Sequence, residues 1–206
     1  MGLNTDYTEA GPEYTNPPPE PLGLLRDWIK LATERGVREP GALALATVDR
    51  AGRPSSRMIQ TLDVTDRGLV FTSHAGSRKG RDIAVTGQGS GVLYWRETNQ
   101  QVVLAGTVER LPDAVCDRLW ADRPSAALPM SIATRQSEPL VDARALLAEA
   151  QRLATCGEPL PRPRFWVGYL LVPSTVEFWQ SSPDRLYHRL RYDRDGEAWR
   201  TVRLQP

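Results

Sequence analysis

Hydroxyl-bearing and basic side chains gather in one short stretch of the chain, residues 68–80. An apolar run typical of a strand leads there into a Ser- and Gly-containing turn, and two cations follow where a helix would begin. Hydroxyls, turn amides and cations at a helix N-terminus converge on the charge of a bound phosphate. The candidate anion-binding residues are Thr72, Ser73, Ser77, Arg78 and Lys79. The alternative is that Arg78 and Lys79 only solvate the first helical turn.

Two other basic regions could contribute to binding. Arg57 lies in a β-rich segment expected to pair beside the strand at 68–74, and an arginine within an apolar strand needs an anionic partner unless it faces solvent. Residues 178–192 mix aromatic side chains with alternating cations. Such a mixture could stack on a nucleobase or a flavin, or could simply be a solvated edge strand.

Histidine and cysteine usage indicates no catalytic triad and no metal site. His74 and His188 lack the neighbouring serine, cysteine or carboxylate of a nucleophile triad, so we expect structural roles for both. Cys116 and Cys156 have no partners at metal-ligand spacing and are expected to be free thiols packed against helices.

The surrounding sequence predicts an α+β domain. Apolar periodicity favours helices over 22–36, 78–85, 113–121 and 142–155. Candidate strands cover 42–49, 54–64, 68–74, 89–96, 101–111, 165–172, 175–179, 185–191 and 198–204. Because strands and helices do not alternate as βαβ units, we expect an antiparallel barrel with about six or seven strands and three or four flanking helices.

Bulk composition excludes several classes of protein. The 206 residues include 26 basic and 25 acidic side chains, so no net field draws the chain to nucleic acid or an anionic membrane. No apolar run approaches the ~20 residues that cross a bilayer, and no secretory signal is present, which predicts a cytoplasmic protein. Residues 1–20, rich in Pro, Glu and Thr, are expected to be a flexible segment preceding one domain at 21–206.

Several separated motifs, in order, resemble the pyridoxamine 5′-phosphate oxidase family over nearly all of 21–206. Within that family the chain is most similar to the branch that acts in phenazine biosynthesis. The most specific matches are 57–60, 76–79, 93–98, 101–102, 135–137, 177–180, 185–186, 189–193 and 203–206.

The resemblance implies an FMN-binding split β-barrel that forms a homodimer, with FMN held at the subunit interface by both chains. The flavin N5 would carry the chemistry, so no side chain is expected to be catalytic. The matched cofactor-binding positions are Arg57, Met58, Ile59, Gln60, Thr72, Ser73, Arg78, Lys79, Gln101, Gln136, Ser137, Trp179 and Arg189.

The substrate positions depart from the family pattern. The family holds a substrate phosphate with a lysine, a tyrosine, an arginine and a serine, and the matched residues here are Leu62, Leu119, Arg123 and Ala127. A phosphate would therefore lose charge-assisted hydrogen bonds worth about 1.5–3 kcal/mol each. The family's Arg-x-His appears as Arg185, Leu186 and Tyr187, with the histidine shifted to the next position.

These departures suit a flat tricyclic carboxylate, with apolar walls against its rings and Arg123 or Arg185 for its charge. The resemblance thus implies an FMN-dependent oxidase that oxidises a reduced phenazine-carboxylate precursor (dihydro-, tetrahydro- or hexahydrophenazine carboxylic acid) with O2, giving H2O2. The alternatives are a pyridoxamine/pyridoxine 5′-phosphate oxidase, a non-catalytic flavin- or haem-binding module, and a deazaflavin-dependent reductase.

Overall fold

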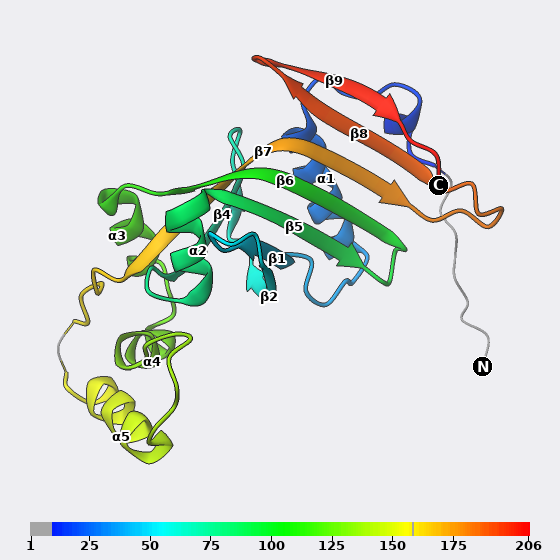
Figure 1. Ribbon diagram of the computed structural model, residues 1–206. Helices are drawn as coiled ribbons and strands as arrows, with labels where there is room; N and C mark the ends of the chain where they lie inside the picture. Colours follow the sequence, from blue (N-terminus) through cyan, green and yellow to red (C-terminus); the bar gives the residue numbers. More distant parts are fainter. Residues whose placement is uncertain (1–9, 158) are drawn as a thin grey trace.

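A curled antiparallel sheet dominates the computed structural model, which describes residues 10–157 and 159–206 (Figure 1). Its nine strands in the described part are β1 (Ala42–Val48), β2 (Pro54–Gln60), β3 (Asp63–Val64), β4 (Leu69–His74), β5 (Gln88–Trp95), β6 (Gln100–Arg110), β7 (Trp166–Gln180), β8 (His188–Asp195) and β9 (Ala198–Arg203). The helices are α1 (Pro21–Glu34), α2 (Arg78–Thr86), α3 (Asp113–Ala121), α4 (Leu128–Ala133) and α5 (Ala143–Ala154), with 3-10 turns at Pro12–Tyr14 and Ser125–Ala127.

The long strand β7 belongs to two parts of the sheet. The strand order is β2-β1-β5-β6-β7-β4-β3, and β8 also pairs with β7 and then with β9. The first half of β7 pairs with β4 and its second half with β8, while β6 runs along most of its length. The register shifts at Gly106, where a Cβ would lie 2.1 Å from the Val172 carbonyl oxygen, so only glycine fits this approach.

The sheet curls without closing. Strands β2 and β4 approach each other, but neither pairs with the other: β2 pairs with β1, and β4 with β3 and β7. The prediction that the strand of Arg57 pairs beside 68–74 is therefore wrong, although the curl still brings the two strands together. The predicted α+β split antiparallel barrel with flanking helices is confirmed.

One face of the sheet is covered by α1 and forms the core. Leu25 and Trp28 of the helix are buried, and Trp28 lies edge-on to Phe178 with ring centroids 5.0 Å apart. Trp95 completes this aromatic cluster at 6.2 Å from Trp28. The apolar side of α1 therefore packs against this face of the sheet and excludes water from it.

Residues 12–18 lie against this core. Tyr14 is buried, the Trp28 indole donates to Glu13 Oε1 at 3.0 Å, and the Tyr192 hydroxyl donates to the Pro18 carbonyl at 3.0 Å. The expected flexible segment 1–20 therefore includes residues tied to the domain by buried rings. Residues 1–9 lie outside the described part of the chain.

Element boundaries differ from the predicted ones for local reasons. The run 54–64 divides into β2 and β3, and the runs 165–172 and 175–179 form the single strand β7. The residues 178–192 do not form an edge strand, because β9 covers β8. Cys116 is buried as expected, whereas Cys156 is exposed. Within the described residues no helix has the length and apolar character of a membrane span.

Candidate functional site

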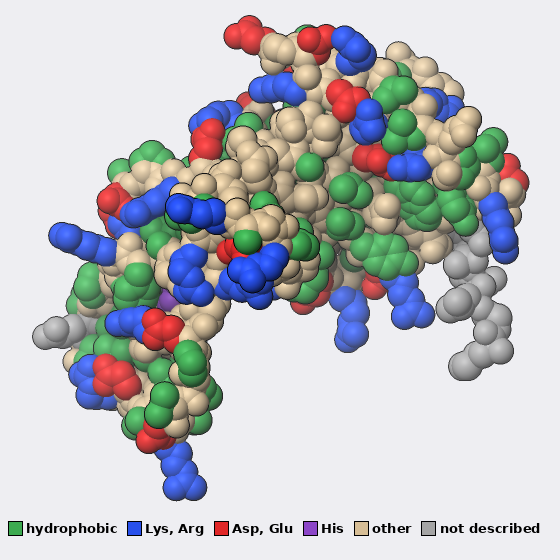
Figure 2. All heavy atoms as spheres, viewed as in Figure 1, with side chains coloured by type: hydrophobic (Ala, Val, Ile, Leu, Met, Phe, Trp, Pro, Cys, Tyr) green, Lys and Arg blue, Asp and Glu red, His purple; other side chains and the backbone are tan. Residues whose placement is uncertain are grey.

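The predicted anion-binding segment forms the junction between β4 and α2. Ser77 caps α2, accepting the Gly80 amide at 3.2 Å, and Lys79 Nζ donates to Ser73 Oγ at 3.0 Å. Figure 2 shows basic side chains gathered where α2 lies in Figure 1. Lys79 is partly buried and aims at its hydroxyl partner, which contradicts the alternative that it only solvates the helix; Arg78 is exposed.

Arg57 reaches this junction from β2. Strand alternation places Ser55, Arg57 and Ile59 on the face of β2 that continues the buried face of β1. The guanidinium donates from Nη1 to Thr47 Oγ1 at 2.8 Å and from Nη2 to Ser55 Oγ at 2.6 Å. These two hydroxyls belong to paired residues of the β1–β2 hairpin, so the arginine is held by both strands.

The electrostatics of Arg57 and Lys79 indicate a site for an anion. Burial lowers the pKa of Lys79, and the nearby charge of Arg57 lowers it further. Burial also lowers the pKa of Arg57, an effect that Asp82 opposes and Arg78 reinforces. Partly buried cations that repel one another are stabilised by a bound dianion. The donor set therefore fits a phosphomonoester.

Asp82 is a site residue that the sequence reading missed. It is buried on α2 and accepts Thr47 Oγ1 at 2.7 Å and Ser55 Oγ at 3.2 Å, the same hydroxyls that hold Arg57. The sequence does carry a sign of this role, since Asp82 is next to Ile83 on the side of α2 that is buried. A buried carboxylate requires hydrogen-bond or charge partners.

The loop after α4 brings two more predicted residues to α2 within the same chain. Gln136 Oε1 accepts hydrogen bonds from Ser73 Oγ at 3.1 Å and from Lys79 Nζ at 3.4 Å. Ser137 Oγ accepts a hydrogen bond from the Arg78 amide at 3.0 Å. Ser137 has a φ of 71°, a left-handed conformation that is costly for a non-glycine residue and is often found at functional sites.

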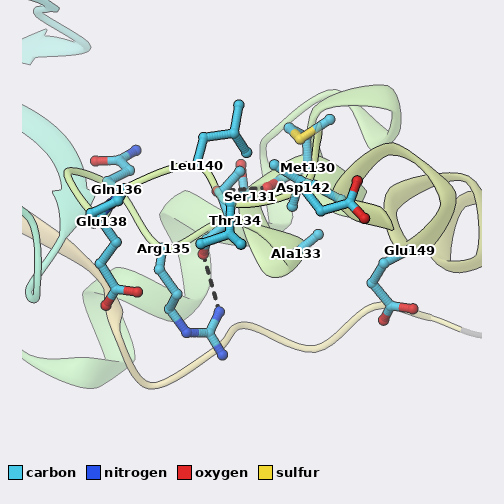
Figure 3. A pocket seen from close by; sticks show the side chains of 13 residues that line it. Met130, Ser131, Ala133, Thr134, Arg135, Gln136, Glu138, Leu140, Asp142 and Glu149 are labelled. Carbon is cyan, nitrogen blue, oxygen red and sulfur yellow. Dashed lines mark hydrogen bonds between the residues drawn. The ribbon is translucent and has the colours of Figure 1, made fainter. Parts of the chain in front are cut away.

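A cavity of about 740 Å³ lies on the other side of this loop, between α4 and α5 (Figure 3). Its lining runs from Gln136 and Glu138 to Glu149 of α5, and Arg135 turns back to the carbonyl groups of Ile132 and Thr134. Neither Arg57 nor Lys79 lines it. This cavity is thus adjacent to the paired-cation site and does not coincide with it.

The remaining cofactor candidates form a second cluster on the opposite face of the sheet. Gln101 and Trp179 are register partners, and each is flanked by a residue that points into the core. The ring centroids of Tyr187 and Trp179 are 5.0 Å apart, and Arg189 Nε donates a hydrogen bond to Glu177 Oε1 at 2.7 Å. The His188 ring instead lies against Tyr14, with ring centroids 5.3 Å apart, so the shifted histidine faces away from Trp179.

Met58 and Gln60 lie on this second face too, exposed on β2, whereas Ile59 turns inward with Arg57. The structure therefore divides the predicted cofactor residues. Arg57, Ser73, Lys79, Gln136 and Ser137 meet at the β4–α2 junction with Arg78 beside them, whereas Gln101, Trp179 and Arg189 are across the sheet. Thr72 points to the other side of β4 from Ser73, where its register partner Gly168 lies beside Leu119.

Arg123 is the charged member of the predicted substrate positions. Its guanidinium carbon lies 5.5 Å from the Trp120 ring and 5.1 Å from the Trp166 ring, and Nη2 donates to Ser131 Oγ at 2.9 Å. Nε is buried without a hydrogen-bond partner in the described residues. Burial lowers the pKa of Arg123, which makes it a receptive site for an anionic group.

The Ala127 carbonyl accepts a hydrogen bond from Arg123 Nη2 at 3.5 Å, and Leu119 lies four residues before Arg123. Leu62 follows β2, and its side chain lines a hollow shared with Ile29 of α1. Leu119 is half-buried beside Gly168, the register partner of Thr72. The Leu62 amide donates to the Val70 carbonyl at 2.8 Å, and its side chain is exposed. Arg185 is exposed in the β7–β8 loop with a φ of 63°, so the prediction that its strand begins at 185 is wrong.

The fold defines a split-barrel protein, and its paired cations have the charge that a phosphorylated ligand requires. Models of two families match: "Pyridoxamine 5′-phosphate oxidase" over residues 29–157 and "Pyridoxine 5′-phosphate oxidase C-terminal dimerisation region" over 166–206. The chain belongs to the pyridoxamine 5′-phosphate oxidase family, which confirms the predicted resemblance and the class of flavin-dependent oxidase.

Individual relatives divide between two activities. A dihydrophenazinedicarboxylate synthase of Burkholderia lata is 50% identical, covering 95% of this chain and 92% of the relative. A pyridoxine/pyridoxamine 5′-phosphate oxidase of Rubrobacter xylanophilus is 39% identical, covering 100% and 95%. The crystal structure of PhzG from Burkholderia lata with tetrahydrophenazine-1-carboxylic acid superposes with a TM-score of 0.94, at 49% identity over 96% of this chain and 98% of that one.

Proposed function

We propose that this protein is a cytoplasmic, homodimeric FMN-dependent oxidase that oxidises a reduced tricyclic phenazine-carboxylate precursor with O2 and releases H2O2. The observation that carries the proposal is the proximity of Arg57 and Lys79 at the β4–α2 junction, together with substrate positions that are apolar except for Arg123. The phosphate site accounts for FMN, and the altered substrate positions account for a substrate without a phosphate.

The phosphate of FMN fits the donors of this site. Lys79 and Arg57 would neutralise the dianion, Ser73 would donate a hydroxyl, and the N-terminus of α2 would add its dipole. The outer edge of β2, the first strand in the sheet order, would offer its backbone to the ring system. When bound, FMN would supply the two-electron redox chemistry, for which no protein side chain is needed.

The substrate positions favour a tricyclic carboxylate over pyridoxamine phosphate. Leu62, Leu119 and Ala127 replace three polar groups with carbon, so rings gain apolar contact where a phosphate would lose hydrogen bonds. Arg123 remains to bind one carboxylate. The names of the Burkholderia lata synthase and of the tetrahydrophenazine-1-carboxylic acid complex support this substrate class.

A site shared between two copies explains why the cofactor residues are divided. Ser73, which accepts a hydrogen bond from Lys79, pairs with Val167 near the start of β7. Trp179 lies twelve residues further along that strand, about 40 Å at ~3.3 Å per residue, and it projects from the opposite face. One FMN held by Arg57 and Lys79 cannot also contact Trp179 of the same chain by direct reach. We infer that Gln101, Trp179 and Arg189 come from the second copy, in agreement with the matched dimerisation region.

The test is oxygen uptake by the holoprotein with tetrahydrophenazine-1-carboxylic acid in air-saturated buffer. We expect a yellow protein whose released ligand has the mass of FMN, and steady formation of one H2O2 per two-electron oxidation. Tight flavin binding without turnover would favour the non-catalytic module. Release of haem or a deazaflavin in place of FMN would contradict the cofactor assignment.

A further inference from the structure

A buried carboxylate lies behind the phosphate-binding arginine without touching it. Asp82 Oδ2 accepts one hydrogen bond from Thr47 and one from Ser55, and these hydroxyls in turn accept the two Nη donors of Arg57. Within the described residues Arg57 forms no ion pair, so the carboxylate acts on the guanidinium through its charge and through hydrogen bonds to the two hydroxyls.

The direction of these hydrogen bonds matters. A serine or threonine hydroxyl has one proton, and when it donates that proton to Asp82 only lone pairs remain for the guanidinium. The guanidinium of Arg57 can only donate hydrogen bonds, so it needs hydroxyl oxygens whose lone pairs point toward it. Without the carboxylate, each hydroxyl could rotate and present its proton to Arg57. Asp82 therefore fixes two acceptors, one for each Nη group of Arg57, and the Leu45 carbonyl accepts a further hydrogen bond from Nη1 at 3.2 Å.

We propose that Asp82 is a positioning residue that orients Arg57 for the cofactor phosphate through Thr47 and Ser55. The inference rests on the proposed binding of FMN. Asp82 lies on α2, the helix that also carries Lys79, and the helix packs against β1. The relay thus couples the two cations of the site through one helix.

For removal of Asp82, the proposal predicts weaker FMN binding, whereas charge repulsion alone predicts tighter FMN binding. A carboxylate near a phosphate repels it, so removal of the charge alone would tighten FMN binding. Loss of orientation at Arg57 would weaken binding of FMN. It would leave riboflavin unaffected, because riboflavin has the same ring system and no phosphate.

The experiment measures dissociation constants of FMN and riboflavin for the full-length protein stripped of flavin, by quenching of flavin fluorescence. For Asp82→Ala we expect the preference for FMN over riboflavin to fall about tenfold, as for loss of a charge-assisted hydrogen bond. Asp82→Asn keeps an acceptor oxygen and should retain most of the preference. Asp66→Asn, an exposed change of equal charge, is the matched control.

The double variant Thr47→Val with Ser55→Ala removes the relay directly and tests the proposal even if Asp82→Ala fails to fold. It should lower the preference as Asp82→Ala does, and Asp82→Ala should add little to Arg57→Ala. An unchanged preference, tighter FMN binding or equal weakening of both ligands would overturn the proposal. Wild-type protein that fails to prefer FMN, or Arg57→Ala without effect, would instead contradict the proposed cofactor site.

Discussion

The guanidinium carbon of Arg123 lies 5.1 Å from the ring centroid of Trp166, at the start of β7. The centroid of the Trp120 ring lies 5.5 Å from the same guanidinium carbon. The Trp120 indole is held in place by a 2.8 Å hydrogen bond that it donates to the Leu160 carbonyl. The two rings and Ser131 orient the arginine before any ligand is present. A preorganised cation loses little entropy when it binds a carboxylate.

This geometry predicts that Arg123→Met raises KM for tetrahydrophenazine-1-carboxylic acid. One lost charge-assisted hydrogen bond corresponds to about 10- to 100-fold in kcat/KM. FMN affinity should stay within about twofold, since Arg123 belongs to the substrate positions. Steady-state kinetics and a flavin titration measure the two effects, and a weakened FMN complex with unchanged KM would assign the arginine to the cofactor.

Restoring two family side chains should move specificity toward phosphate. The double substitution Leu62→Lys with Ala127→Ser restores the family's lysine and serine at the matched positions, so we expect measurable oxidation of pyridoxamine 5′-phosphate, with kcat/KM raised about tenfold or more. Formation of pyridoxal 5′-phosphate is the readout. If the double variant retains its flavin and gains nothing, these positions do not determine discrimination.

Flavin binding should depend on pH through Lys79. Its pKa is lowered in the folded protein by burial and by Arg57, so the ammonium loses its proton at a lower pH than a free lysine does. FMN affinity should therefore decline as the pH rises through that lowered pKa, and riboflavin affinity should not. Lys79→Arg, which keeps its charge, should flatten the FMN curve.

The same shift has a consequence for the protein without flavin. Because the folded pKa of Lys79 lies below the unfolded value, the charged form costs stability at neutral pH, and that cost is relieved as the pH rises through the lowered pKa. Compared with Lys79→Met, the wild-type protein should therefore gain stability toward alkaline pH in denaturant titrations.

Tyr14 provides a test of the N-terminal packing. Its ring is buried between Trp28 and His188, so Tyr14→Ala should lower the free energy of unfolding by about 3 kcal/mol. Urea denaturation measures the change. Thr15→Ala, at an exposed neighbour, is the control, and equal small effects of both variants would show that residues 12–18 add little stability.

The sequence could predict the fold and the gathering of cations at the β4–α2 junction because both depend on local patterns. Strand alternation, the capping serine and the adjacent cations at 77–79 are readable in short windows. The relay through Asp82 was missed because its hydroxyls come from β1 and β2 and its carboxylate from α2, which meet only after the sheet curls. Similarly, no local pattern reveals that Ser131 would hold Arg123.

The division of the site between sheet faces depends on register, which the sequence left open. Merging two predicted strands into β7 places Trp179 opposite Gln101 and far from Lys79. The shift of His188 toward Tyr14 follows from strand alternation, which turns Tyr187 toward Trp179. These features require the strand pairing itself.

A competition experiment tests the central claim most directly: holoprotein in air-saturated buffer with equal concentrations of tetrahydrophenazine-1-carboxylic acid and pyridoxamine 5′-phosphate, both products being quantified over time. With three polar contacts to phosphate absent, we predict that the tricyclic acid is consumed at least about 100-fold faster, with matching H2O2. Faster formation of pyridoxal 5′-phosphate would contradict the account.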